Sequence, residues 1–464
     1  MAVVTEHAAR SRRGTELWLL LLAVGVAMLA YGLVGVGVDG TWSPRVLAYG
    51  GGLAGLSLVV HLVLRWRAPY ADPVLLPAAV ALNGLGLAMI HRLDLATGSA
   101  QAPRQLLWST IGVVAATVLV VVLRDHRLLR RYTYVAMVAS LLLLLLPLLP
   151  VLGRTINGAR IWIGVGPLSF QPGEIAKITL AVFFAGYLVT ARDTLSLAGP
   201  RVLGLQLPRG RDLGPILVAW AGSVGILVLQ RDLGTSLLFF GLFVAVLYLA
   251  TERTSWIAIG LVLFAAGAYT AFRLFGHVQQ RVDGWLDPFA ADVYDREFGG
   301  SYQLVQGLFG LANGGLTGTG LGRGRPDIVP FANSDFILAS IGEELGLVGL
   351  VAVLMLYLVV VERGLRTAIG VRDGFGKLLA GGLAFTVALQ CFVVAGGVLR
   401  VIPLTGLTMP FLAAGGSSLL TNWLVVALLL RISDAARRPA PPVADPARDP
   451  VDPGAGETQV VRTV

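Results

Sequence analysis

The sequence is poor in cysteine, lysine and charge. Its 464 residues include a single cysteine, Cys391, and only 14% are charged. One cysteine excludes an intrachain disulfide and a cysteine metal centre, and none of the five scattered histidines has the spacing of a zinc site. Soluble domains carry about 25% charged residues, so a soluble fold is excluded.

The net charge of +9 comes from arginine, because Lys177 and Lys377 are the only lysines. Most arginines stand in short segments between apolar runs, where membrane proteins concentrate basic residues. Membrane lipids are therefore expected partners, and nucleic acid is not.

Long apolar runs take the place of the missing charge, since 56% of the residues are hydrophobic. Runs of about 17–25 apolar residues are typical of membrane-spanning helices, whereas the ten-residue alternation of a membrane barrel is not seen. The sequence predicts an all-α polytopic membrane protein with about twelve spans. We expect these at roughly 17–38, 45–65, 73–91, 105–123, 132–152, 173–190, 214–230, 235–250, 256–275, 336–361, 377–397 and 407–431.

An even number of spans places both termini on one side of the membrane. The first apolar run is too long for a signal peptide and lacks a small-residue cleavage site, so we interpret it as a span. The longer loops on the side of the termini are basic, which predicts a cytoplasmic location for both ends. These loops contain Arg65 and Arg67; Arg124, Arg127, Arg130 and Arg131; Arg192, Arg201, Arg209 and Arg211; and Arg363, Arg366, Arg372 and Lys377.

The same alternation places two polar segments outside, Gly153–Pro172 and Gly276–Asp335. The second is long and glycine-rich and contains six aspartates and four arginines. Structureless loops of this length are uncommon and usually functional or disordered, and its apolar and aromatic residues argue against disorder. Chemistry is therefore expected first in residues 276–335. The Pro-, Ala- and Asp-rich residues 435–464 are predicted to be a disordered cytoplasmic tail.

Several ionisable residues stand beside or inside the predicted spans. Glu174 and Lys177 are three apart at the start of a helix and can pair, either as part of a site or as a helix-capping salt bridge. Asp232 can cap the helix that follows it, and Glu343 and Glu344 are expected to face the protein interior or a wet cavity. The glycine-rich run 318–324 is expected to turn its amides towards a phosphate rather than a dinucleotide.

The last predicted span is interrupted by Pro410 and by the run Gly415–Ser418. Broken helices at membrane depth occur where the backbone lines a cavity. The alternative is close packing of helices through small residues.

Taken together, these motifs resemble the SEDS family, whose members include RodA and FtsW, from about Arg104 to Asp434. Gly173 and Arg231 replace the family's serine and proline in two of the signatures. The matching elements are Arg104-Gln105 with Trp108; Arg160 with Trp162; Phe170 to Lys177; Gln230 to Thr235; Tyr302-Gln303; Ser334 to Ile337; Gly342 to Gly346; and Pro410 with Gly415 to Ser418.

The resemblance implies a peptidoglycan glycosyltransferase that polymerises lipid II on the outer face of the bacterial cytoplasmic membrane. It also implies a class B penicillin-binding protein, a transpeptidase, as partner. The family core would occupy residues 71–434, leaving two extra spans in residues 1–70. These spans and the tail favour an elongation-type, RodA-like member over a division-type one.

The family places its essential aspartate shortly before Gly-Tyr-Gln. By position Asp295 or Asp292 corresponds, and by its Asp-Pro motif Asp287 does; we rank them Asp295, Asp287, Asp292. The other expected contacts are with substrate: Arg104, Trp108, Arg160, Gln171, Glu174, Lys177, Tyr302, Gln303, Asp335, Glu343 and Ser417. Glu174 and Asp232 are candidate ligands for Mg²⁺ or Mn²⁺, since divalent cations stabilise a departing pyrophosphate.

Two other function classes remain open at this stage. A lipid II flippase would also need many helices, a polar cavity and buried ionisable groups. A non-catalytic scaffold of the elongation or division machinery would need none of the acids for its function.

Overall fold

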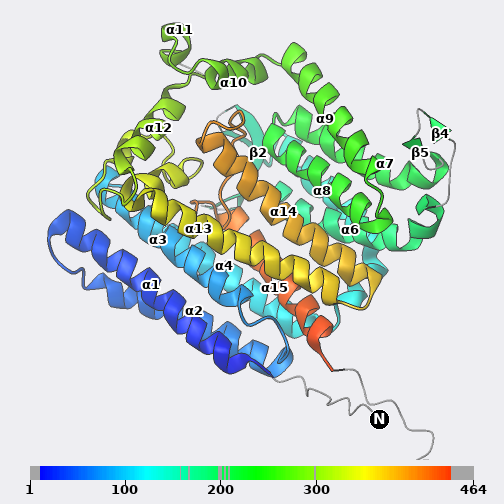
Figure 1. Cartoon of the computed structure of the whole chain (residues 1–464), viewed down its shortest axis with the longest axis horizontal. Helices are drawn as coiled ribbons and strands as arrows, with labels where there is room; N and C mark the ends of the chain where they lie inside the picture. The colour runs from blue at the N-terminus through cyan, green and yellow to red at the C-terminus, as the bar shows by residue number, and fades with distance from the viewer. Residues whose placement is uncertain are drawn as a thin grey trace, which may run out of the picture.

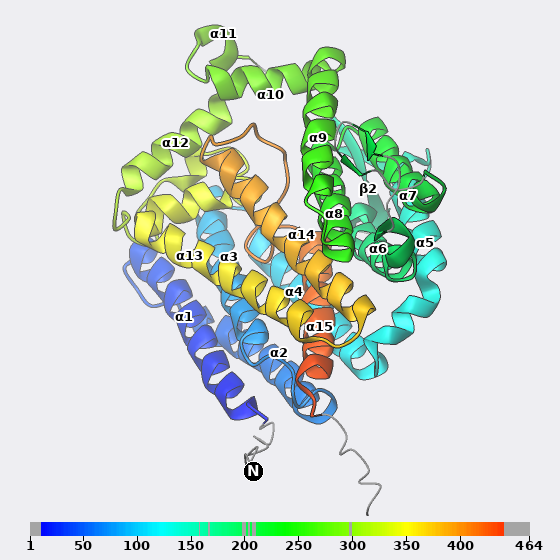
Figure 2. The ribbon, with the colours of Figure 1, turned by 45° about the vertical axis from the view of Figure 1, so that its right-hand side comes forward.

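The computed structural model describes residues 11–156, 158–165, 168–196, 201–202, 205–206, 210–296 and 299–439. Long apolar helices dominate it (Figure 1), and turning the molecule shows them packed as one bundle (Figure 2). Among the described residues, eleven helical segments are long and apolar enough to span a membrane, and a shorter apolar helix covers Leu217–Leu229. The predicted polytopic helical fold is confirmed.

Each predicted span corresponds to an observed helix. The spanning elements are α1 (Arg13–Asp39), α2 (Arg45–Arg67), α3 (Leu75–Thr97), α4 (Gln101–Val122), η1 (His126–Tyr132) continuing into α5 (Thr133–Leu145) and η2 (Leu146–Leu148), α6 (Pro172–Ser196), α7 (Gly210–Leu229), α8 (Leu233–Thr251), α9 (Ser255–Leu274), α13 (Ile337–Gly370), α14 (Gly374–Val398) and α15 (Gly416–Arg437).

The spans are helical as predicted, but the polar segment between α5 and α6 contains strands. Its described residues form an antiparallel sheet in the order β1-β2-β3, with β1 (Gly153–Ile156), β2 (Ala159–Val165) and β3 (Leu168–Phe170). A second antiparallel pair, β4 (Arg201–Val202) and β5 (Leu205–Gln206), follows α6. Ile161, Ile163 and Val165 alternate along β2, and this period-two pattern of β-branched residues is the signal that a helix-based interpretation missed.

The expected long loop is largely helical. It contains α10 (Gly276–Leu286), α11 (Ala291–Tyr294), α12 (Tyr302–Gly314) and η3 (Pro326–Ile328). In both views α10 crosses from the end of α9 towards α12, with α11 beyond it at the edge of the molecule (Figures 1 and 2). We refer to residues 276–314 as the arch.

The last span begins later than predicted. Residues 401–415 form no helix, and α15 starts at Gly416 and runs to Arg437. Helix therefore continues past 435, the expected start of the tail, while residues 440–464 lie outside the described residues. The predicted interruption near Pro410 and Gly415 is present, as a buried irregular segment that precedes the helix rather than a kink within it.

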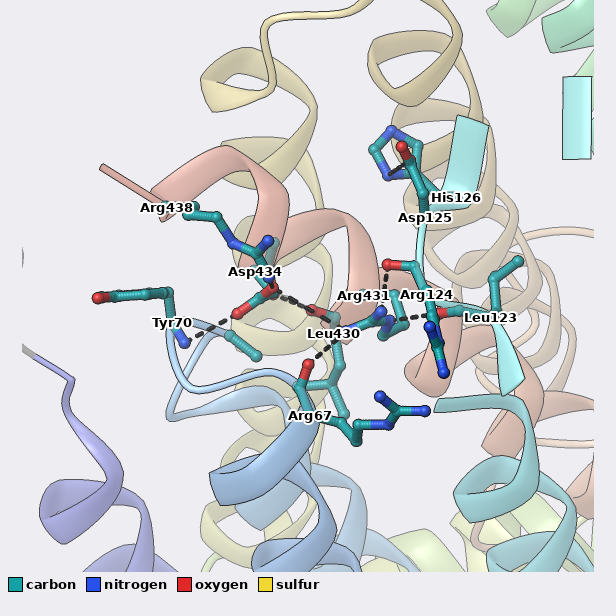
Figure 3. A network of polar contacts seen from close by, with 12 residues as sticks. Arg67, Tyr70, Leu123, Arg124, Asp125, His126, Leu430, Arg431, Asp434 and Arg438 are labelled. Atoms are coloured by element: carbon teal, nitrogen blue, oxygen red, sulfur yellow. Dashed lines mark hydrogen bonds and ion pairs between the residues drawn. The ribbon is translucent and has the colours of Figure 1, made fainter. Parts of the chain in front are cut away.

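A polar hub, made by Arg431 and Asp434, ties the end of α15 to the ends of two other helices (Figure 3). The Arg431 guanidinium donates to the carbonyl oxygens of Leu123 (2.6 Å), Arg67 (2.7 Å) and Arg124, and lies 4.0 Å from Asp434. Asp434 also accepts a hydrogen bond from the amide of Tyr70 (2.9 Å). The last carbonyl groups of a helix lack intrahelical partners and carry partial negative charge, so a buried cation is stabilised where α2 and α4 end together.

Replacing Arg431 by alanine is expected to lower the unfolding midpoint of the purified protein in detergent. Asp434, 3% exposed, would lose its buried partner, and the loss of one member of a buried pair typically costs about 3–5 kcal/mol. Arg438→Ala is the matched control, because Arg438 pairs with the same carboxylate but is 57% exposed, and exposed pairs contribute about 0–1 kcal/mol. Equal shifts of the unfolding midpoint in the two variants would contradict a stabilising role of the buried Arg431 in the hub.

Candidate functional site

A buried ion pair forms the centre of the polar cluster in the helix bundle. Pro172 opens α6, which suits its fixed backbone angle, and places Glu174 and Lys177 on one helical face. The Lys177 ammonium lies 3.0 Å from Glu174 Oε2 and 3.1 Å from Gln390 Oε1 of α14. Gln390 in turn donates from Nε2 to the carbonyl of Thr408 (2.9 Å). The expected pairing of Glu174 with Lys177 is present, and it connects α6, α14 and the segment 401–415.

The helix starts of α6, α8 and α15 meet beside this pair. The amide of Gln171 donates to Ser417 Oγ (2.8 Å), and the Gln171 side chain lies 3.5 Å from Asp232 Oδ2. Asp232 accepts from the Thr235 amide (3.0 Å) and caps α8, as its position in the sequence predicted. The structure therefore brings four expected residues together, with Asp232, in one place: Gln171, Glu174, Lys177 and Ser417.

Arg281 of the arch belongs to this cluster, although it was not singled out from the sequence. It donates to the carbonyl of Leu404 (3.1 Å), and its charge interacts with Asp335 and Asp232. Burial lowers the pKa of Arg281, while those two carboxylates oppose the shift. Burial raises the pKa of Asp335 to about 6 and also raises that of Asp232, with Arg281 opposing both shifts.

Gln390 is the second residue that sequence reasoning missed. It is 1% exposed and stands within the predicted span 377–397, where a buried amide needs partners inside the protein. This isolated polar residue in an apolar run is the signal that was available. Its partners, Lys177 and Thr408, were not identifiable from spacing, because they come from other elements.

The three candidate bases lie on the arch. Asp287 follows α10, Asp292 is in α11, and Asp295 ends α11; all three are exposed. None of their carboxylates has a hydrogen bond or ion pair with another described residue. No contact within the described chain joins them to the Lys177 cluster, so the structure does not choose among them.

Arg400, in the connection after α14, fixes the arch above the bundle. Its guanidinium donates to the carbonyls of Trp285 (2.8 Å) and Leu286 (2.7 Å), and Trp285 Nε1 donates back to the Arg400 carbonyl (3.1 Å). Asp287 is the next residue after this clamp. Arg400 has φ of +58°, an uncommon conformation for a residue with a side chain, and the reciprocal hydrogen bonds stabilise it.

Other expected contact residues have internal roles. Arg160 donates to the carbonyl of Leu149 (3.1 Å), and Gln303 to that of Pro330 (3.0 Å). Tyr302 packs edge-on against Tyr294, with 5.4 Å between ring centroids. Trp108 lies so close to Gly416 that a Cβ there would come within 2.1 Å of its ring. Arg104 is exposed and makes no side-chain hydrogen bond within the described chain.

Gln105, next to Arg104, holds the irregular segment before α15. Its side chain donates to the carbonyl of Ala413 (3.0 Å) and accepts from the amide of Gly415 (3.2 Å). Buried backbone that is not helical needs such partners. Gln105 and Trp108 therefore position the start of α15, which carries Ser417.

The prediction that the glycine-rich loop turns its amides towards a phosphate is wrong for those amides that already donate hydrogen bonds within the protein. Gly322 donates to Glu344 Oε2 (2.9 Å), and Arg325 to Glu343 Oε1 (2.9 Å). Arg92 of α3 donates from Nε to Glu344 Oε1 (2.7 Å). As expected, the two glutamates face the interior and have different partners. Glu343, an expected substrate contact, anchors residues 318–325.

A break in α13 at Gly346 also holds this loop. Gly346 has φ of +67°, which glycine adopts without steric cost. Around the break, the carbonyls of Glu343 and Glu344 accept from the amides of Thr319 and Gly320, each at 3.0 Å. Peptide groups thus replace the interrupted helical hydrogen bonds.

Helix α1 packs directly on the glycine-rich loop. A Cβ added to Gly37 would lie 2.0 Å from the carbonyl oxygen of Leu321, and one added to Gly322 would lie 2.8 Å from the carbonyl oxygen of Val34. Tyr31 of α1 stacks on His91 of α3 with ring centroids 4.3 Å apart. Helix α1 therefore supports the loop that Glu343 and Glu344 anchor.

The described residues contain no group of three or more His, Cys, Asp or Glu side chains placed to hold a metal ion. Glu174 and Asp232 are near enough to interact electrostatically, but Lys177 and the Thr235 amide already contact their oxygens. These two carboxylates fit the way Mg²⁺ is usually bound, by one or two acids together with substrate phosphates, and do not form a cage of their own.

Comparison with known proteins adds the following matches. Residues 73–438 match the family model of FtsW, RodA and SpoVE, described as cell cycle protein. The peptidoglycan glycosyltransferase RodA of Mycobacterium tuberculosis is 51% identical over 438 residues, which cover 92% of each chain. The probable peptidoglycan glycosyltransferase FtsW of Geobacter metallireducens is 32% identical and covers 78% of this chain and 94% of its own.

A solved structure is similar over most of the chain. It belongs to a study of structural coordination of polymerization and crosslinking by a peptidoglycan synthase complex. The TM-score is 0.63 at 28% sequence identity, and the match covers 79% of this chain and 98% of that one.

Gly37→Ala is expected to displace the glycine-rich loop and destabilise the protein, because the added methyl group would overlap the Leu321 carbonyl. Gly25→Ala in the same helix is the control, since a Cβ there meets nothing within 4 Å. Replacing an unhindered helical glycine by alanine typically stabilises by about 0.5–1 kcal/mol. Unfolding midpoints in detergent should therefore shift in opposite directions, and a stabilising Gly37→Ala would disprove the contact.

Asp335 is expected to make stability depend on pH. Its pKa rises from 3.8 to about 6 on folding, so folding favours the neutral acid. That contribution is fully present below pH about 4 and is lost as the pH rises through about 6. The stability of the wild type relative to Asp335→Asn should therefore fall between these values and level off above them. Denaturation midpoints of both proteins across this range measure it, and a relative gain with rising pH would refute the assignment.

Proposed function

The chain belongs to the FtsW, RodA and SpoVE family of cell cycle proteins, and we propose that it polymerises lipid II into glycan strands with the polar cluster beneath the arch. This membership confirms the resemblance drawn from the sequence motifs. The chain is a peptidoglycan glycosyltransferase in a multi-pass membrane fold, as its named relatives and its helices agree. The higher identity to RodA (51%) than to FtsW (32%) supports an elongation role.

The observation that carries the proposal is the convergence of a buried cation, Lys177, and a half-buried one, Arg281, on the same polar cluster. Lys177 comes from a spanning helix and Arg281 from the arch. Glycosyl transfer from a pyrophosphate donor needs positive charge where the leaving group departs. A guanidinium and an ammonium that are partly or fully buried supply it more strongly than exposed groups would.

The transfer needs a base as well as positive charge. The acceptor hydroxyl oxygen forms a bond to the anomeric carbon of the donor while the bond from that carbon to the pyrophosphate oxygen breaks. The hydroxyl proton passes to a carboxylate. We assign this role to an aspartate of the arch, with Asp295 ranked before Asp287 and Asp292. Their exposure leaves all three accessible to an incoming acceptor.

The other side chains of the cluster orient the reacting groups. Glu174 and Gln390 contact the Lys177 ammonium. Ser417 and Asp232 contact Gln171, which directly precedes the N-terminus of α6. Asp335 balances the charge of Arg281. Glu174 and Asp232 are proposed ligands of Mg²⁺ or Mn²⁺ shared with the substrate pyrophosphate, where the metal would add positive charge to the leaving group.

The proposal includes an orientation and a partner. The basic loops favour a cytoplasmic location for both termini, and with that orientation the arch lies on the outer face, where lipid II is presented. A class B penicillin-binding protein is the proposed partner. The similar structure from a peptidoglycan synthase complex, in which polymerization and crosslinking are coordinated, supports this choice.

The central experiment is polymerisation of purified lipid II by the reconstituted full-length protein, with and without the transpeptidase partner. Alanine variants of Asp295, Asp287 and Asp292 are assayed singly, and one of them is expected to lose about 10²–10⁴-fold in rate, the usual contribution of a general base. Wild-type rates in all three would discard the arch-aspartate mechanism.

The same assay tests the cations and the metal. Lys177→Met is expected to abolish polymer formation, whereas Lys377→Met, which removes the only other lysine, a 43% exposed one, is expected to leave it unchanged. Chelation followed by Mg²⁺ or Mn²⁺ addition reports metal dependence. Movement of labelled lipid II between leaflets without polymer would favour the flippase, and normal growth of cells carrying the inactive variants would favour the scaffold.

A further inference from the structure

A separate hollow lies on the other side of the segment that leads to Asp335. Its volume is about 290 Å³, at the lower end of the range for small-ligand pockets. Its walls are the end of α3, the turn into α4, and the stretch from Asp327 to Asn333. None of the residues around Lys177 lines it.

An exposed aromatic ring stands at this hollow. Phe331 is 53% exposed and has φ of +54°, a region that bulky residues rarely adopt. The conformation is held because the Phe331 carbonyl accepts from the amides of Ser334 (3.0 Å) and Phe336 (3.3 Å), and Phe336 is fully buried. A strained backbone that keeps an apolar ring exposed needs an explanation other than core packing.

The other walls are nearly neutral and combine apolar residues, Leu93, Val329, Pro330 and Ala332, with polar ones. Thr97, Ser99, Gln101 and Asn333 supply hydroxyl and amide groups, and the side-chain amides of Gln101 and Asn333 have no hydrogen bond within the described chain. Asp327 is the single charged residue of the lining and pairs with Arg325 at 3.4 Å. With no cation lining it, the hollow does not suit a pyrophosphate.

A ring face beside neutral donors and acceptors suits an uncharged sugar, whose C–H face packs on the ring while its hydroxyl and acetamido groups form hydrogen bonds. The hollow is also coupled to the proposed site. The Ala414 amide donates to the Asn333 carbonyl (2.7 Å), and Asp335 follows two residues later. The side chain of Gln303, on the arch, donates to the carbonyl of Pro330.

We propose that this hollow binds a sugar unit of the growing glycan strand, at a distance from the bond being formed. The assignment rests on the proposed function, because the hollow would be a second subsite for the glycan strand that is lengthened at the Lys177 cluster. Phe331 supplies the stacking surface, and Asn333 and Gln101 supply hydrogen bonds. Retention of the strand here lengthens the product without taking part in the transfer.

The test is the length distribution of glycan made from lipid II by the full-length protein. Phe331→Leu keeps the apolar bulk but removes the ring, and it is expected to shorten the mean strand roughly fivefold while the rate of the first linkage stays unchanged. Phe331→Tyr is expected to preserve strand length. Phe392→Leu, which alters a 58% exposed phenylalanine on α14, is the matched control.

Strands of wild-type length from Phe331→Leu would overturn the subsite, as would an equal loss of first-linkage rate, which indicates a structural role. A second arm measures direct binding of a soluble N-acetylglucosamine oligomer to the wild type and to Phe331→Leu. If the wild type forms no polymer, the proposed function fails and this arm decides the subsite. Saturable binding weakened by Phe331→Leu supports it, and binding that is absent or unchanged in the variant refutes it.

Discussion

The Lys177 ammonium is the group whose burial constrains the rest of the molecule. A cation inside an apolar bundle is stable only with an opposite charge and with hydrogen-bond acceptors in place. Glu174 supplies the charge from one turn away, but the remaining acceptor, Gln390, comes from α14 and is itself held by the Thr408 carbonyl. The spanning helices and the irregular segment before α15 must therefore assemble together for this charge to be tolerated.

The irregular segment explains why so much polarity lies around it. Residues 401–415 lack helical hydrogen bonds and are largely buried from Leu407 to Ala413, so side chains from elsewhere, including Gln105 and Arg281, bond to peptide groups of the segment. The glycine-rich loop follows the same rule, because Glu343, Glu344 and the break at Gly346 satisfy its amides. The two loops thus resemble binding loops in sequence, yet many of their backbone amides and carbonyls form hydrogen bonds within the protein.

The sequence predicted what depends on local pattern. Apolar runs located the spans, and the spacing of Glu174 and Lys177 predicted their pair, since both are set by helix geometry. It did not predict the sheet at 153–170, whose strands are short, or the arch helices, which lack the length of a span. It could not predict that Gln390 is a second partner of Lys177 or that Arg92 pairs with Glu344, because these residues lie far apart along the chain. The same holds for Arg281 and Asp335. Such contacts depend on tertiary packing, which no local spacing encodes.

The division of the proposed site between bundle and arch has a mechanistic consequence. Lys177 lies in the bundle and Arg281 of the arch interacts with carboxylates of the same cluster, whereas the three candidate bases are exposed on the arch. The α10 part of the arch is fastened to one short stretch of the bundle, by Arg281 to Leu404 and by Arg400 to Trp285 and Leu286. In the proposed mechanism, Glu174, Asp232 and Asp335 are less suited as the base than the arch aspartates, because a cation or an amide already interacts with each of them. The proton of the acceptor hydroxyl therefore passes to a carboxylate outside the cluster. We expect a substrate that spans arch and bundle to place the base and the cations on opposite sides of one anomeric carbon.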